Sequence, residues 1–158
     1  MSRTSLCVTL VSVSIGIACG GLTGPEAVAG TYALLTIGGE RLPFRMTSGG
    51  FNPGFPGGSE LPATNDDYVE ITSSSIQLNA DTTFSWTLAG NVSQGGEVTP
   101  DNFTATGTFE VVDTAVELYL TGLPLVDPDT PITCSIVGDT LTMGEGEGEE
   151  MEWVFVKV

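Results

Sequence analysis

From residue 30 onward, apolar and polar residues alternate along the chain with a period of two. This is the pattern of strands that have one buried and one solvent-facing side. The clearest example is the series Phe84, Trp86 and Leu88, which alternates with Ser, Thr and Ala. No segment shows the 3.6-residue period of an amphipathic helix. The pattern therefore predicts an all-β domain.

The same alternation predicts further strands, separated by turns that contain Gly, Asp or Asn. These strands are residues 31–37, 41–46, 68–72, 76–78, 84–89, 103–111, 116–120, 132–136, 141–143 and 151–158. Three longer loops are expected between them, at residues 47–67, 91–102 and 121–131. The chain thus reads as about eight to ten short strands.

Successive hairpins without intervening helices favour an antiparallel up-and-down meander. Closing such a meander removes its exposed edges. We therefore expect an up-and-down β-barrel of about eight to ten strands, and a two-sheet β-sandwich is the alternative.

The start of the chain has a different character. Arg3 is followed by an uncharged, apolar run from Leu6 to Ala18. This run is shorter than the roughly 20 residues of a membrane-spanning helix and fits the core of a signal peptide. Together with Cys19, it resembles a bacterial lipoprotein signal peptide. We expect residues 1–18 to be the signal peptide, 19–29 a Gly- and Ala-rich tether, and 30–158 the barrel domain.

Two cleavage sites compete in this segment. Ile17-Ala18 before Cys19 resembles the lipobox, although Gly16 stands where Leu is usual. The other site is Ala27-Val28-Ala29, an A-x-A sequence typical of ordinary secretion. The first is favoured because the second lies far beyond the apolar run. The resemblance then implies acylation of Cys19 and sorting to the outer membrane, whereas the second site implies a secreted or periplasmic soluble protein.

Charge and composition narrow the function. The chain carries 20 acidic and 4 basic residues, a net charge of −16, which argues against nucleic acid and anionic lipid as partners. It contains no histidine, and so lacks the commonest general base and zinc ligand. We expect a monomer that is not an enzyme and has no cofactor.

Cys134 shares the apolar side of its strand with Ile132 and Ile136, which predicts a buried, inert thiol. If Cys19 is acylated, Cys134 has no partner for an intrachain disulfide. If Cys19 is not acylated, a bond between the two cysteines stays open.

Several short motifs resemble the lipocalin-like domains of small bacterial lipoproteins. They are Gly30-Thr31-Tyr32-Ala33-Leu34 with Gly38-Gly39 and Leu42-Pro43, then Leu78-Asn79-Ala80-Asp81-Thr82-Thr83-Phe84, Gly107-Thr108-Phe109, Gly138-Asp139-Thr140-Leu141-Thr142 and Trp153-Val154-Phe155. The resemblance covers about residues 29–158 and implies a calyx-shaped barrel that holds a small apolar ligand. Tyr32 replaces the tryptophan typical of true lipocalins, and no basic residue is expected to cap it from a late strand.

Four aromatic residues are candidates for lining a ligand cavity, or alternatively for filling the barrel as core: Tyr32, Phe84, Trp86 and Phe109. Phe51 and Phe55, in a Gly- and Pro-rich loop, are candidates for a lid or a partner anchor, or for a plug of core residues. The acidic segments 145–150 and 65–67 are expected to be solvated turns, with a weak cation site as the alternative and no metal centre predicted.

These observations predict a lipid-anchored binding module of the cell envelope, attached to the membrane through Cys19, with a small hydrophobic molecule as the expected ligand. The alternative is a structural or protein-interaction module of the envelope that has no small-molecule ligand.

Overall fold

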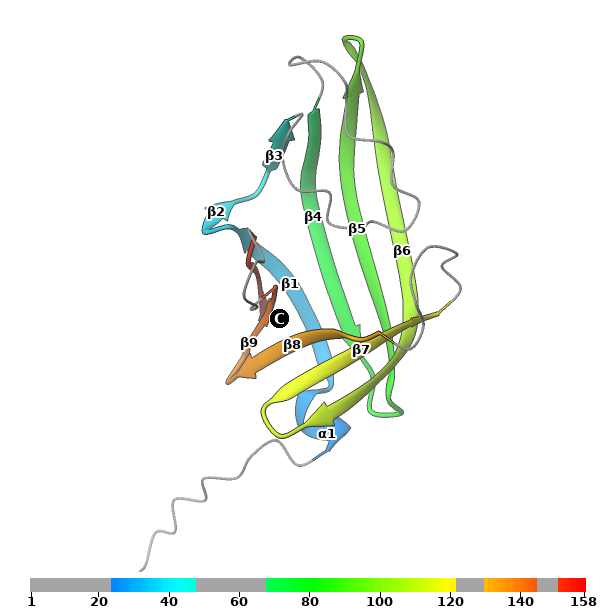
Figure 1. Ribbon diagram of the computed structural model, residues 1–158, viewed down its shortest axis with the longest axis vertical. Coiled ribbons are helices and arrows are strands. Elements are labelled where there is room, and N and C mark those ends of the chain that lie inside the picture. The colour runs from blue at the N-terminus through cyan, green and yellow to red at the C-terminus, as the bar shows by residue number, and fades with distance from the viewer. Residues whose placement is uncertain (1–23, 48–67, 122–129, 145–150) are drawn as a thin grey trace, which may run out of the picture.

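The computed structural model describes residues 24–47, 68–121, 130–144 and 151–158 (Figure 1). Of these residues, 74% lie in strands. The elements are α1 (Pro25–Val28), β1 (Gly30–Ile37), β2 (Glu40–Arg41), β3 (Phe44–Thr47), β4 (Tyr68–Leu78), β5 (Thr83–Gln94), β6 (Glu97–Val112), β7 (Ala115–Thr121), β8 (Ile132–Val137), β9 (Thr140–Met143) and β10 (Trp153–Lys157).

All strand pairs are antiparallel, in the order β2-β1-β10-β9-β8-β7-β6-β5-β4-β3. β1 also pairs with β4, with Gly30 opposite Leu78 and Tyr32 opposite Ile76. This pairing closes eight strands into a barrel and leaves β2 and β3 as additional strands. The predicted antiparallel up-and-down barrel is confirmed.

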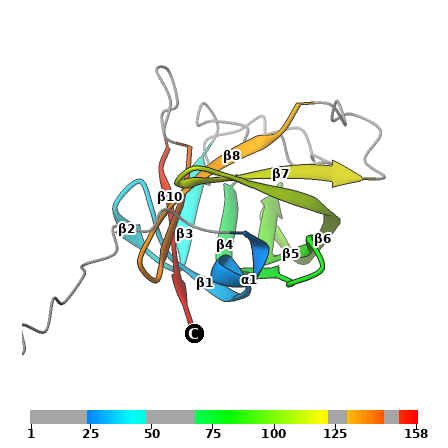
Figure 2. The ribbon, with the colours of Figure 1, turned by 90° about the horizontal axis from the view of Figure 1, so that it is seen from below.

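The barrel is closed at one end and opens into a taller sheet at the other (Figure 1). β1 pairs with β4 only over residues 75–78, and the other half of β4 pairs with β3 instead. Likewise, β7 pairs only with residues 106–112 of β6, whereas β5 pairs with residues 97–108. β3 to β6 therefore extend beyond the closed ring. Figure 2, seen from below, shows α1 at the opposite, closed end.

The prediction of a loop over residues 91–102 is wrong. β5 and β6 continue as a hairpin that turns at Gly95 and Gly96, with φ angles of 60° and 84°. Two successive residues with positive φ form a tight two-residue turn that matches the twist of the strands. Residues 97–102 are all exposed, because this part of β6 lies beyond the barrel. With no buried side, its sequence shows no alternation.

The predicted return strand 41–46 is divided into two. β2 pairs with β1, and β3 pairs with β4. Leu42 and Pro43 separate them, and Pro43 has no backbone N–H for a strand ladder. The two short strands therefore connect β1 to β4 where these two strands have separated.

β4 joins two segments that the sequence predicts as separate strands, 68–72 and 76–78. A register shift between Ile71 and Ser73 allows this, because an extra residue in a bulge reverses which side chains point inward. Ile71 and Ile76 are both fully buried although they lie five positions apart. The same shift turns the hydroxyl of Ser74 into the interior, where Ser74 is 7% exposed.

Part of the segment expected to be a tether is ordered against the barrel. Pro25 to Val28 form the single turn of α1, with proline in the first turn, where its missing N–H costs nothing. Val28 is fully buried. α1 is thus part of the barrel domain.

The core consists of the inward residues of all eight barrel strands, together with Val28 and two residues of β3. It comprises Val28, Tyr32, Leu34, Ile37, Phe44, Met46, Ile71, Ile76, Leu78, Phe84, Trp86, Leu88, Ala105, Phe109, Val116, Leu118, Leu120, Cys134, Ile136, Leu141, Met143, Trp153 and Phe155. In the part of the chain that the structure describes, no helix has the length and hydropathy needed to cross a membrane.

Candidate functional site

The four aromatic residues predicted to line a cavity all point into the barrel. Tyr32, Phe84, Trp86 and Phe109 are exposed by 1%, 2%, 6% and 1% respectively. Phe84 lies directly over Gly107 of the neighbouring strand, since a Cβ atom there would come within 2.7 Å of the Phe84 ring. The absence of a side chain at Gly107 makes room for the ring. All four belong to one cluster of buried hydrophobic residues.

Trp86 is at the centre of an aromatic cluster. Its ring makes edge-to-face contacts with Phe103 and Trp153, at centroid distances of 6.2 and 6.3 Å, the geometry that aromatic quadrupoles favour. Its indole Nε1 donates a hydrogen bond to Ser74 Oγ at 2.9 Å. Ser74 Oγ in turn donates to the carbonyl oxygen of Thr87. The bulge in β4 thus supplies the polar partner that a buried tryptophan needs.

Tyr32 lies at the closed end of the barrel, between α1 and the last strand. Its hydroxyl donates a hydrogen bond to the carbonyl oxygen of Val28 at 2.8 Å. Burial and, to a smaller extent, the Asp139 carboxylate raise the pKa of the Tyr32 hydroxyl. The phenol is therefore held in its neutral, donating form.

The expectation that no basic residue caps Tyr32 is wrong. Lys157 Nζ lies over the Tyr32 ring, 5.7 Å from its centroid, within the range of a cation–π contact. The two residues are opposite each other in the pairing of β1 with β10. Lys157 is the chain's one lysine and lies next to its last residue. If the first and last strands are taken as neighbours, a lysine at this position is expected to lie opposite Tyr32.

Toward the open end, the core continues into apolar side chains that are only partly buried. They are Leu42, Val69, Phe103, Ile132 and Met151, and a sixth such residue, Val111, lies beside the β6–β7 turn instead. Phe103 links this group to the deep cluster through its contact with Trp86. Most of the partly buried apolar side chains thus lie toward the open end.

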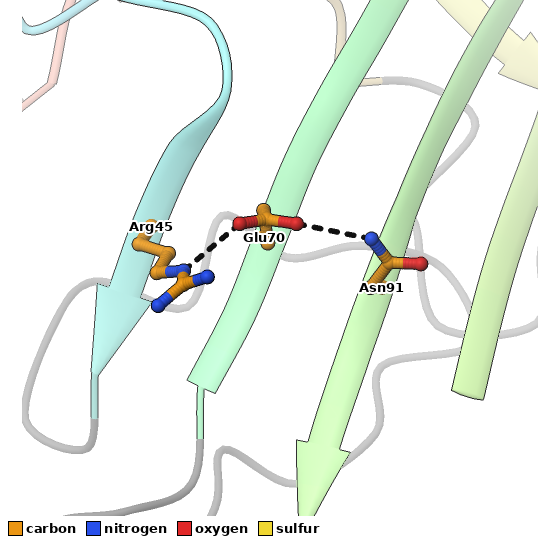
Figure 3. A network of polar contacts seen from close by, with 3 residues as sticks. All are labelled: Arg45, Glu70 and Asn91. Carbon is orange, nitrogen blue, oxygen red and sulfur yellow. Dashed lines mark hydrogen bonds and ion pairs between the residues drawn. The ribbon is translucent and has the colours of Figure 1, made fainter. Parts of the chain in front are cut away.

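A polar network lies outside the barrel where β3, β4 and β5 run side by side (Figure 3). Arg45 Nε donates to Glu70 Oε1 at 2.9 Å, and Asn91 Nδ2 donates to Glu70 Oε2 at 3.0 Å. The Arg45 guanidinium also covers the Tyr68 ring, 4.1 Å from its centroid. The hydrogen bonds from Asn91 and Arg45 lower the pKa of Glu70. Sequence reasoning missed this network because its members come from three different strands.

Cys134 is fully buried, which confirms the predicted buried thiol. Burial raises the pKa of this thiol to about 12. At neutral pH it carries almost no thiolate, the reactive form. The Cys134 side chain therefore acts as part of the core.

The other candidates lie outside the described residues: Cys19, Phe51, Phe55 and the acidic segments 65–67 and 145–150. Within the described ranges, no group of three or more His, Cys, Asp or Glu side chains is arranged to hold a metal ion.

Comparison of the chain with protein-family models, with curated proteins and with solved structures found no match.

Proposed function

We propose that this chain is a lipid-anchored, non-catalytic binding module of the bacterial cell envelope. The interior of the barrel supports the non-catalytic part. The buried polar residues of the described chain are Ser74 and Ser93, and no carboxylate is buried. The buried titratable groups described above, the Tyr32 hydroxyl and the Cys134 thiol, both have a raised pKa and stay neutral. General acid–base chemistry needs titratable groups that converge in a shielded site.

The observation that carries the anchor proposal is the position of α1. Cleavage after Ala29 would remove Val28, which is fully buried, and would take away the acceptor of the Tyr32 hydroxyl. A mature chain that begins at Cys19 retains both. The structure therefore favours processing before Cys19 over processing after Ala29, and with it the lipoprotein form of the leader.

The segment between Cys19 and Pro25 is short, so an acylated Cys19 would set the orientation of the barrel relative to the membrane. Five residues, 20–24, span at most about 15–20 Å. An acylated Cys19 would hold the closed end of the barrel, which carries α1, close to the membrane. The open end with the β5–β6 hairpin would point away from it (Figure 1), where it is accessible to ligands and partners.

Labelling with radioactive palmitate tests the anchor. We expect label in the wild-type protein expressed in a two-membrane bacterium, and none in Cys19→Ala. Cys134→Ala is the matched control and should be labelled like the wild type, because Cys134 is buried. Absence of label from the wild type, or an N-terminus at Gly30, would reject the proposal.

A small apolar ligand is the second candidate, and the partly buried residues at the open end favour it. The contact of Lys157 with Tyr32 also supports the likeness to lipocalin-like domains, which implies a ligand. Because the deep aromatic residues are buried in one core cluster, a ligand would bind above them, against Phe103 and Val69.

Native purification followed by organic extraction and mass spectrometry tests this second candidate. We expect a co-purifying hydrophobic molecule, and about tenfold less of it from Val69→Asp, which places a charge in the apolar site. Thr108→Asp, on the outer wall, is the control and should retain the molecule. A wild-type protein that yields no such molecule would contradict the ligand proposal and leave the anchor proposal unaffected.

A further inference from the structure

The outer wall of the barrel carries an apolar area on four neighbouring strands, β8, β9, β10 and β1. Their outward residues alternate with the buried ones, and their apolar members are Ala33, Leu35, Val137, Val154 and Val156. We call these five residues, together with Ser135, Thr140 and Thr142 between them, the valine face. The strand register aligns them in rows, with Ala33 opposite Val156, Val156 opposite Thr140, and Thr140 opposite Val137.

Two strands of this face are apolar on both sides. β10 has four successive apolar residues, Trp153 to Val156, and β1 has four more, Tyr32 to Leu35. The inward members are core. Of the outward members, Leu35 is exposed, and Ala33, Val154 and Val156 are partly buried. Continuous apolar runs are typical of strands that are covered on both faces, whereas strands with one wet face alternate. The sequence of β1 and β10 thus indicates a covered outer surface.

Leu35 is the most distinctive residue of the valine face. The register of β1 with β10 shifts between Leu34 and Thr36, so Leu35 is the additional residue of a bulge, which re-aims a side chain. Its side chain is 48% exposed, and Val137, at the far side of the face, is 77% exposed. Large apolar side chains that are held outward in this way mark contact surfaces.

The distribution of charged residues on and around the valine face indicates which partner it binds. None of the outward residues of these four strands is charged, and their one charged residue, Lys157, lies over Tyr32 instead. Charged residues border the face: Asp139 in the turn after β8, Glu152 before β10, Glu117 of β7 opposite Thr133, and the base Arg41 of β2 opposite Thr36. In a chain of net charge −16, approach of a second copy through other surfaces brings acids together. At the valine face the residues in contact carry no charge, and the acids of the two copies lie only at the rim.

We propose that the valine face binds the valine face of a second copy of this chain, in a two-fold symmetric dimer. Such an interface is isologous, so that one self-complementary patch serves both partners. Two sheets packed face to face lie about 10 Å apart, and Val and Leu side chains fill this space. The acidic residues around the face then remain at the solvated rim. This dimer replaces the monomer expected from the sequence and does not depend on the lipid anchor.

Crosslinking in the cell envelope tests the dimer. Thr142 lies opposite Val154, in the middle of the face, where the two-fold axis of a centred dimer would pass. The full-length Thr142→Cys protein should therefore give a covalent dimer with a short bismaleimide. Thr108→Cys, exposed on β6 of the other wall, is the matched control and should remain monomeric. Cys134 is buried and does not contribute.

A charge on the face should abolish the crosslink. Leu35→Glu in the Thr142→Cys protein is expected to lower the dimer yield about tenfold, because it places two carboxylates in one interface. Thr104→Glu, exposed on β6, should leave the yield unchanged. Both side chains are exposed, so both variants should keep the wild-type unfolding transition.

Three results would overturn the proposal. One is equal dimer yield from Thr142→Cys and Thr108→Cys. Another is an unchanged yield with Leu35→Glu. The third is a Thr142→Cys thiol that is shielded from water-soluble maleimide and gives no dimer, which would indicate a lipid surface instead. The same crosslink should form in a Cys19→Ala background, so failure of the anchor and failure of the dimer are distinguishable.

Discussion

The hydroxyl of Tyr32 and the carbonyl oxygen of Val28 are joined by a hydrogen bond of 2.8 Å inside the closed end of the barrel. Both residues are almost completely buried. A side chain of the first strand thus holds in place the helical turn that precedes it. This contact makes residues 25–28 part of the domain, although their composition is that of a linker.

Replacement of Tyr32 by Phe keeps the ring and removes the hydroxyl. The Val28 carbonyl then loses its buried partner, so we expect the free energy of unfolding to fall by about 1–2 kcal/mol. Urea denaturation measures this. Tyr119→Phe is the control, because the Tyr119 hydroxyl bonds to Glu117 at the partly exposed surface. A loss in Tyr119→Phe as large as that in Tyr32→Phe would contradict the role assigned to the buried bond.

Gly107 is required by close packing in β6. A Cβ atom at this position would lie 1.9 Å from the Tyr119 carbonyl oxygen and 2.7 Å from the Phe84 ring. We therefore expect Gly107→Ala to destabilise the barrel by about 1–3 kcal/mol, the usual cost of an overpacked core. Thr108→Ala, at the next and exposed position, should change stability by less than about 0.5 kcal/mol. Equal midpoints of thermal unfolding for the two variants would show that β6 has room at Gly107.

The sequence predicts the interior of the barrel well because one buried face imposes a period of two. Phe84, Trp86 and Leu88 were expected on one face, and all three are core residues. The prediction fails where this constraint ends. Residues 97–102 lie beyond the closed ring with both faces exposed, so nothing selects alternating residues, and Pro100 and Asp101 are rare in strands.

The candidate site was harder to predict, because it depends on which strands become neighbours. Phe84 and Trp86 were recognised from their own strand. Ser74, the hydrogen-bond partner of Trp86, was not, because the bulge after Ile71 reverses the side on which Ser74 lies. Lys157 was missed because its contact with Tyr32 requires the first and last strands to pair. Local pattern does not contain that information.

Glu70 should make the stability of the protein depend on pH in the acid range. Its pKa is lowered in the folded state, chiefly by the hydrogen bond from Asn91 and then by Arg45. A lowered pKa stabilises the fold above the unfolded-state value of 4.5 and ceases to do so as the pH falls through the folded-state value. We therefore expect wild type to be more stable than Glu70→Gln at neutral pH, with a difference that disappears in acid.

Urea denaturation of both proteins from neutral pH downward measures this difference. The lowered pKa of Asp81 acts equally in both and cancels. In Asn91→Ala the largest cause of the shift is gone, so the contribution of Glu70 to stability should be smaller and its loss should be complete at a higher pH than in wild type. A difference between wild type and Glu70→Gln that stays constant down to strongly acid pH would exclude the network as its source.

The thiol of Cys134 should report on opening of the barrel. Because burial raises its pKa to about 12, the native protein at neutral pH presents neither an accessible thiol nor a thiolate. We expect a maleimide to label Cys134 only as fast as the chain unfolds, and immediately in denaturant, whereas an exposed thiol in Thr108→Cys should react at once. The raised pKa also stabilises the fold below pH 9, and this contribution should be lost between about pH 9 and 12. Rapid labelling of Cys134 in the native wild type would mean that β7, β8 and β9 separate without global unfolding. These three strands would then form a part of the barrel wall that opens in the native state.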